Sequence, residues 1–174
     1  MTKGVQTAVY VAQGKIEISA SPQVYFSTVL GSCVAACLWD NEAAVGGMNH
    51  LLLPPDDTTA SGEGVHLMEL LINGLLKRGA EKHRLRAKLF GGARMIDNLS
   101  DIGARNAAFA RNFFQFERID VVSSSLGGDH GRRVKFWPTD GRAKQRFIMD
   151  STPMVEQLPS RGEQTAASGD VDLF

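Results

Sequence analysis

The sequence predicts a single domain that contains both β-strands and α-helices, and three observations point to it. Short runs with strand character occupy the first and last thirds of the body, segments between them repeat apolar residues at helical spacing, and turn signals separate these elements. With 174 residues, 43% of them hydrophobic, the chain can bury a sizeable core. We expect residues 1–150 to form this domain and residues 151–174, which are polar and without periodicity, to form a flexible tail with a frayed end.

The N-terminal part is expected to be β-structure. Residues 7–20 alternate apolar and polar side chains around Gln13-Gly14, which predicts a short hairpin or two edge strands. Residues 23–29 form a further β-rich run. Residues 30–54 then predict a hairpin, because two apolar runs flank the polar, turn-prone residues 40–43.

The middle of the chain is expected to be mainly helical. Residues 65–78 carry their polar side chains in one narrow stripe at spacings of three and four, which predicts a largely buried helix. Before it, residues 56–64 form a polar loop. After it we expect a strand at residues 85–90 and helices at residues 93–99 and 102–116.

The last part of the body returns to strands. A strand at residues 119–124 leads into a glycine-rich turn at residues 126–131, and a second hairpin follows over residues 132–137 and 143–149. Glycine-rich loops can bind phosphate, but no spacing typical of phosphate-binding loops is present. We therefore expect a turn, placed beside the active site.

Composition and charge argue against several classes of protein. The formal net charge is zero, whereas nucleic-acid-binding domains are clearly basic. No segment has the apolar length that membrane insertion requires, and the N-terminus shows no signal pattern, so we expect a cytoplasmic protein. The two cysteines, as free thiols, suit a reducing compartment.

Candidate chemistry lies in residues 30–54, which contain Cys33 and His50. If the hairpin is centred between Asn41 and Glu42, these two residues face each other directly, with Cβ atoms roughly 4.5 to 5.5 Å apart. The thiolate is the nucleophilic form of cysteine, and a neighbouring imidazole that takes the proton activates it. The pattern therefore predicts a cysteine–histidine dyad.

The same residues also admit a structural interpretation. A buried cysteine often acts as a small hydrophobe, and a lone histidine in an apolar strand is commonly a core residue. A slip of one residue in the register would send Cys33 and His50 to opposite faces. On the catalytic interpretation, Gly31 leaves space beside the sulfur, and the backbone N–H groups of Ser32 and Cys33 are placed to bind a developing oxyanion.

Six motifs occur in order between residues 25 and 142: LGSC, GGMNH, LLLP, GGARM, IGARN and GGDHGRR. With them the chain resembles the CheD family of chemoreceptor glutamine deamidases of bacterial and archaeal chemotaxis. The resemblance covers most of the body and leaves the tail outside. It implies a fold of the α+β class, with layered, β-sandwich-like mixed sheets flanked by helices, similar to bacterial toxin deamidases with a papain-like site.

The resemblance implies a role for each site residue. The nucleophile falls on Cys33 and the general base on His50. The third catalytic residue, a threonine hydroxyl in the family, falls here on Ser27, with Thr28 next to it as an alternative or supporting group. Counted along a straight strand, Ser27 shares a face with Cys33 and Thr28 points away, unless Gly31 bends the chain.

The implied reaction is that of a protein-glutamine glutaminase, which hydrolyses receptor glutamine side chains to glutamate and releases ammonia. It requires no metal and no cofactor. The implied substrate is the cytoplasmic helices of methyl-accepting chemoreceptors, and a CheC-type phosphatase is a further candidate partner. The alternative function is a non-catalytic module that docks on the receptor or on this phosphatase.

Two other classes of site use the cysteines differently. One is a metal site built from Cys33, Cys37 and a histidine, and the other is redox sensing through the two thiols. In a strand Cys33 and Cys37 would lie roughly 13 Å apart, which is too far for one zinc ion or for an intramolecular disulfide.

Overall fold

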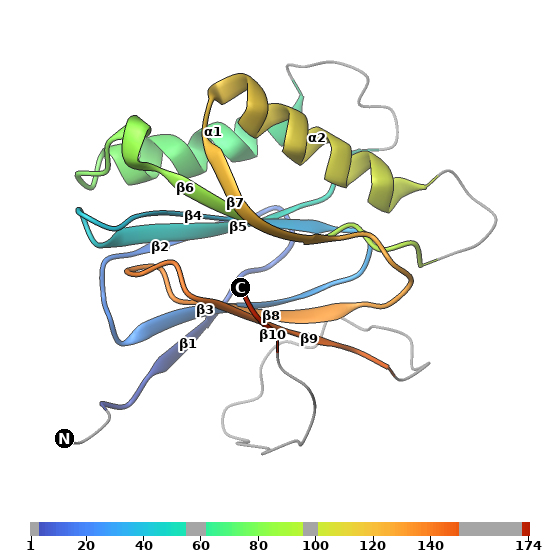
Figure 1. Cartoon of the computed structure of the whole chain (residues 1–174), viewed down its shortest axis with the longest axis horizontal. Coiled ribbons are helices and arrows are strands. Elements are labelled where there is room, and N and C mark those ends of the chain that lie inside the picture. Colours follow the sequence, from blue (N-terminus) through green and yellow to red (C-terminus); the bar gives the residue numbers. More distant parts are fainter. Residues whose placement is uncertain (1–3, 55–61, 96–100, 150–171) are drawn as a thin grey trace.

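Two five-stranded sheets pack face to face, and two α-helices cover the outer face of one of them (Figure 1). This arrangement is seen in a computed structural model that describes residues 4–54, 62–95, 101–149 and 172–174. The α+β prediction and the layered, sandwich-like arrangement implied by the resemblance are confirmed. None of the helices among the described residues combines the length and apolar character that a membrane span needs.

The first sheet, sheet A, is the outer β layer. Its strand order is β1-β3-β8-β9-β10, with β1 parallel to β3 and the other neighbours antiparallel. The strands are β1 (Thr7–Tyr10), β3 (Val24–Leu30), β8 (Arg132–Phe136), β9 (Ala143–Phe147) and β10 (Asp172–Leu173). One face of this sheet points to solvent, which explains the alternation of buried and more exposed residues in β3 and β8.

The second sheet, sheet B, is the middle layer. Its order is β2-β5-β4-β6-β7. The strands are β2 (Ile16–Ser19), β5 (Val45–Leu51), β4 (Val34–Asp40), β6 (Arg86–Gly91) and β7 (Asp120–Leu126). Every residue of β4 and β5 is buried, because sheet A covers one face and the helices cover the other. This double covering explains why both strands are nearly continuous apolar runs.

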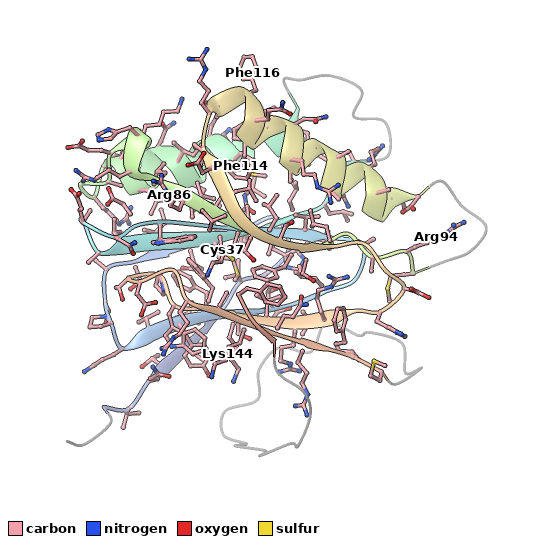
Figure 2. All side chains as sticks on the ribbon, viewed as in Figure 1. Cys37, Arg86, Arg94, Phe114, Phe116 and Lys144 are labelled. Atoms are coloured by element: carbon pink, nitrogen blue, oxygen red, sulfur yellow. The ribbon has the colours of Figure 1, made fainter. Side chains whose placement is uncertain are left out.

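The helical layer consists of α1 (Glu63–Leu76) and α2 (Ile102–Glu117), and a short 3-10 turn, η1 (Lys82–Arg84), precedes β6. The Asp101 side chain caps α2 by accepting a hydrogen bond from the Ala104 amide at 2.9 Å. Figure 2 shows Phe114 of α2 directed toward sheet B and Phe116 directed away from it. Phe114 is fully buried, whereas Phe116 is 84% exposed.

Three crossings between the sheets meet at one end of the sandwich. Residues 11–15 lead from β1 to β2, residues 31–33 from β3 to β4, and residues 127–131 from β7 to β8. These crossings lie close together: Val34, after the second crossing, pairs with Gly91, which pairs with Leu126 just before the third. The first crossing joins them through the hydrogen bond from the Gly14 amide to the His50 carbonyl. The predicted glycine-rich turn is the third of these crossings, so it lies at the same end as Cys33.

Most predicted elements are confirmed, but one hairpin is wrong. Residues 7–20 do not form a hairpin, because β1 and β2 belong to different sheets; each lies at the edge of its own sheet, as the alternative predicted. The helix predicted at 93–99 is absent from residues 93–95. Its remainder lies outside the described residues, as does most of the loop at 56–64.

The end of the chain is ordered, which contradicts the predicted frayed terminus. Strand β10 pairs antiparallel with β9, and Phe174 stacks edge-on against Phe90 with ring centroids 5.5 Å apart. The apolar contact with Phe90 and the backbone bonds between Phe174 and Ala143 provide the physical reason. The rest of the predicted tail lies outside the described residues.

Candidate active site

The Cys33 loop is held by three consecutive backbone carbonyls. The carbonyls of Gly31, Ser32 and Cys33 each accept a hydrogen bond of 2.8 to 3.0 Å. The donors are, in order, the Ala93 amide, the side-chain amide of Asn106 in α2, and the Gly92 amide. With its backbone fixed in this way, Cys33 keeps a partly exposed side chain that packs at the margin of the inter-sheet core.

His50 lies near the end of β5 and is only 3% exposed. The crossing at residues 11–15 wraps around it: the Gly14 amide donates to the His50 carbonyl at 2.8 Å, and the His50 amide donates to the Lys15 carbonyl at 3.2 Å. The ring faces sheet A, because Nδ1 lies 2.9 Å from the Thr28 hydroxyl and 3.2 Å from the Val11 carbonyl. The histidine is therefore fixed from both sheets.

The predicted direct pairing of Cys33 with His50 is wrong by two residues. His50 pairs with Ala35, and Cys33 comes just before the strand as the diagonal neighbour. The reason is the turn, which spans residues 41–44 with Ala44 at a φ of 51°, so the hairpin is centred one residue later than predicted. A shift of two residues preserves the face, and both side chains remain on the side of sheet B that faces sheet A. Diagonal neighbours lie within reach of long side chains.

Thr28, and not Ser27, is the hydroxyl that the fold brings to His50. Thr28 is fully buried, whereas the neighbouring Ser27 is half-buried and alternates to the outer face of β3. The expectation that Thr28 points away is wrong, because β3 and β4 belong to different sheets and residues 31–33 turn the chain between them. Parity counted along one straight strand therefore does not apply.

The hydrogen bonds around His50 specify its tautomer. The Thr28 hydroxyl donates to the Val11 carbonyl at 2.8 Å, which uses its only proton. Because that carbonyl and the Thr28 oxygen are then both acceptors, Nδ1 of His50 must carry a hydrogen and donate. This leaves Nε2, on the other side of the ring, as the basic nitrogen.

The second cysteine sits in a different environment. Cys37 lies in β4 between the two sheets (Figure 2) and is fully buried, and its burial raises the pKa of the thiol. Such a thiol stays protonated and unreactive at neutral pH. Both cysteines are free, and the described parts of the chain hold no cluster of three or more histidine, cysteine or acidic side chains placed to bind a metal.

Sequence reasoning missed two side chains at the site, Asn106 and Gln13. Asn106 is fully buried in α2 and joins the Cys33 loop to the segment after β5, donating to the Ser32 carbonyl and accepting from the Leu53 amide at 3.0 Å. A polar residue inside an apolar helical face was the available signal. The sequence pattern predicts Gln13 only as a turn residue, yet its side-chain oxygen lies 3.8 Å from the sulfur of Cys33.

A cavity of about 560 Å³ opens behind the Cys33 loop. It lies between α2 and the 127–128 turn, and its lining includes Gly92, Arg94 and Arg111. Cys33, His50 and Thr28 are not among the residues that line it. One of its lining residues, Gly92, supports the site, because its amide donates a hydrogen bond to the Cys33 carbonyl.

Comparison with known proteins gives a consistent picture. The family profile described as "CheD chemotactic sensory transduction" matches residues 55–147. Three similar proteins each bear the name "Probable chemoreceptor glutamine deamidase CheD". The one from Caulobacter vibrioides is 52% identical over 95% of this chain and 92% of its own length. The one from Rhizobium leguminosarum is 55% identical over 92% of this chain and 92% of its own length. The one from Agrobacterium fabrum is 52% identical over the full length of both chains.

Similarity to solved structures is more distant. The hypothetical protein YfiH of Bacillus licheniformis aligns with a TM-score of 0.42 and 11% identity, over 70% of this chain and 60% of that one.

Proposed function

Since this chain belongs to the CheD family, we propose that it is a chemoreceptor glutamine deamidase that uses Cys33 as nucleophile and His50 as general base. Relatives at about 52% identity over nearly the whole chain carry that name. The observation that supports the chemistry most directly is the fixed imidazole: Nδ1 of His50 is engaged by Thr28 and Val11. Nε2 is thereby left to act as the base.

The reaction begins with proton transfer. Nε2 of His50 accepts the Cys33 proton, and the sulfur attacks the carbonyl carbon of a glutamine side chain. The electron pair of the C=O bond moves to oxygen. When it returns, the C–N bond breaks, and His50 donates its proton to the leaving nitrogen, which departs as ammonia.

Water completes the cycle by hydrolysing the thioester. Nε2, now neutral again, takes a proton from the water as it attacks, and collapse of the intermediate releases the glutamate side chain and returns the proton to Cys33. Thr28 touches no reacting atom. Its role is to hold the ring in the tautomer that makes Nε2 basic, as the acidic member of a catalytic triad does.

The substrate we propose is the cytoplasmic helices of chemoreceptors, and a CheC-type phosphatase remains a predicted second partner. We place the protein in the cytoplasm, where the receptor segments lie and where its two free thiols stay reduced.

The test is deamidation of a receptor cytoplasmic fragment. It is measured by the mass gain of about one unit that amide hydrolysis gives and by the release of ammonia. The wild-type protein and Cys37→Ala should both convert glutamine to glutamate, whereas Cys33→Ala should be inactive while folded. Comparing two cysteine variants separates the proposed nucleophile from a general need for thiols.

A non-catalytic docking module is the rival function. It predicts that wild-type protein binds the receptor fragment but produces no glutamate over long incubation. Equal binding by wild type and Cys33→Ala, with deamidation only by wild type, would exclude it.

A further inference from the structure

The side chain of Gln13 contacts the sulfur of Cys33. Gln13 lies in the crossing at residues 11–15, and Cys33 lies in the crossing at residues 31–33. Its carboxamide oxygen lies 3.8 Å from the sulfur, within the range of a weak S–H···O hydrogen bond. The side chain is exposed, so this contact lies on the open side of the thiol, where a substrate amide must approach. Nothing in the reaction described above uses it.

The backbone that carries Gln13 is firmly held. The next residue, Gly14, donates to the His50 carbonyl, and Lys15 accepts from the His50 amide. On the other side, Val11 binds both Thr28 and the His50 ring. The peptide segment that orients the base therefore also presents the Gln13 carboxamide to the nucleophile.

We propose that Gln13 is a catalytic residue that donates a hydrogen bond from its side-chain amide to the oxyanion formed when Cys33 attacks. The inference rests on the proposed function. A carboxamide offers an oxygen acceptor and an NH₂ donor at nearly the same positions, exchanged by rotation of its last torsion. In the resting enzyme the Gln13 oxygen faces the S–H group of Cys33. After attack, the Gln13 NH₂ group faces the oxyanion.

No covalent bond of Gln13 forms or breaks during the reaction. As the carbon–sulfur bond forms, the C=O pair moves to the substrate oxygen, and the Gln13 N–H, together with the backbone N–H of Cys33, binds the resulting charge. When ammonia leaves, the pair returns to carbon and the hydrogen bond weakens. The amide thus stabilises the tetrahedral intermediate more than the bound substrate, which lowers the barrier rather than KM.

The experiment compares Gln13→Ala with wild type on a receptor fragment, using Gln23→Ala as control because Gln23 is also an exposed glutamine in a loop. Loss of one oxyanion donor typically lowers kcat about 100-fold or more. We expect a fall of about that size for Gln13→Ala with KM changed less than about threefold, and no change for Gln23→Ala.

A second measurement separates donation from a merely structural role. Alkylation of Cys33 by iodoacetamide forms no oxyanion, so its rate in Gln13→Ala should stay within about twofold of wild type. Parallel losses of kcat and alkylation rate would show that Gln13 only shapes the loop, and an unchanged kcat would show that it does nothing; either result overturns the proposal. Absence of deamidation by wild type would instead overturn the proposed function.

Discussion

At the level of single residues, the proposed chemistry depends on how the imidazole of His50 is held. His50 is almost entirely buried, and the Thr28 hydroxyl donates a hydrogen bond to the Val11 carbonyl and accepts one from Nδ1 of His50. A hydrophobic side chain of the same shape at position 28 would keep the packing and remove this acceptor. Of the two acceptors at Nδ1, the Val11 carbonyl at 3.2 Å would remain.

Thr28→Val should therefore lower kcat by roughly 10- to 100-fold, part of the 10²- to 10⁴-fold that a positioned acid–base group contributes. The matched variant Ser27→Ala, one residue away on the outer face, should retain wild-type kcat. Steady-state rates of ammonia release from a receptor fragment would measure both. Equal losses in the two variants, or loss only in Ser27→Ala, would contradict the assignment of Thr28.

The sequence alone singles out Cys33 and His50 as candidate reacting groups, but it does not give their exact pairing or the hydroxyl that lies against His50. Cys33 and His50 stand out because each is a polar, chemically active residue in an apolar run. The pairing was displaced by two residues because the turn contains a left-handed residue, Ala44, that no glycine or asparagine signals. The choice between Ser27 and Thr28 required knowing that the chain changes sheets.

At the scale of the element, the β4–β5 hairpin is fixed at its turn by Asp40. This buried carboxylate accepts backbone hydrogen bonds from Glu42, Ala43 and Glu81 and forms an ion pair with Arg84 at 2.9 Å. Burial alone would raise the pKa of Asp40, but these hydrogen bonds and the guanidinium hold it below its ordinary value. The register that aligns His50 with the Cys33 loop therefore depends on an ionised residue at the far end of the hairpin.

Asp40→Asn should lower the free energy of unfolding by about 2 kcal/mol at pH 6. Because the native pKa of Asp40 is below the ordinary value of 3.8, its stabilisation is present above that value and is lost as the pH falls through the native pKa. Urea unfolding at pH 6 and at pH 3 or below should show the difference between wild type and variant shrinking in acid. A difference that is constant with pH would contradict the role of the charge.

The end of β6, where Gly91 lies against the Cys33 loop, gives a second prediction for an element. A Cβ at Gly91, where φ is 111°, would lie 2.1 Å from the Cys33 carbonyl oxygen, whereas a Cβ at Gly79, where φ is 97°, would meet nothing within 4 Å. Gly91→Ala should therefore displace the nucleophile loop and abolish deamidation. Gly79→Ala should cost only the backbone strain, about 1 kcal/mol. Urea unfolding and activity assays on the two variants would test this, and an active, stable Gly91→Ala would contradict it.

At the level of the whole molecule, sheet A, sheet B and the helical layer all contribute to the end of the sandwich where the three crossings meet and where Cys33 lies. The helices and both sheet faces were predictable because amphipathic spacing and doubly buried runs leave clear patterns. The membership of β1 and β2 in different sheets was not, because pairing between strands far apart in sequence is decided by the core that forms between the sheets. The short strand β10 was missed for the same reason, since its partner β9 is distant in the chain.

Phe174 should contribute to global stability and not to catalysis. Its ring packs on Phe90, and Nζ of the buried Lys88 donates to its carbonyl and, at 2.7 Å, to that of Gly141. Phe174→Ala should lower the free energy of unfolding by roughly 2 kcal/mol and leave kcat within about twofold of wild type. Phe116→Ala, which alters an 84% exposed ring, should change stability by less than about 0.5 kcal/mol. Thermal or urea unfolding of both variants would reveal whether the two phenylalanines differ in this way.

The most direct measurement of the central claim is mass spectrometry of the protein acid-quenched during turnover of a receptor fragment. An acyl-enzyme adduct equal to the fragment minus ammonia should appear on the peptide that contains Cys33, persist on that cysteine in Cys37→Ala, and be absent from Cys33→Ala. Rapid glutamate formation by Cys33→Ala, or an adduct confined to Cys37, would contradict the account.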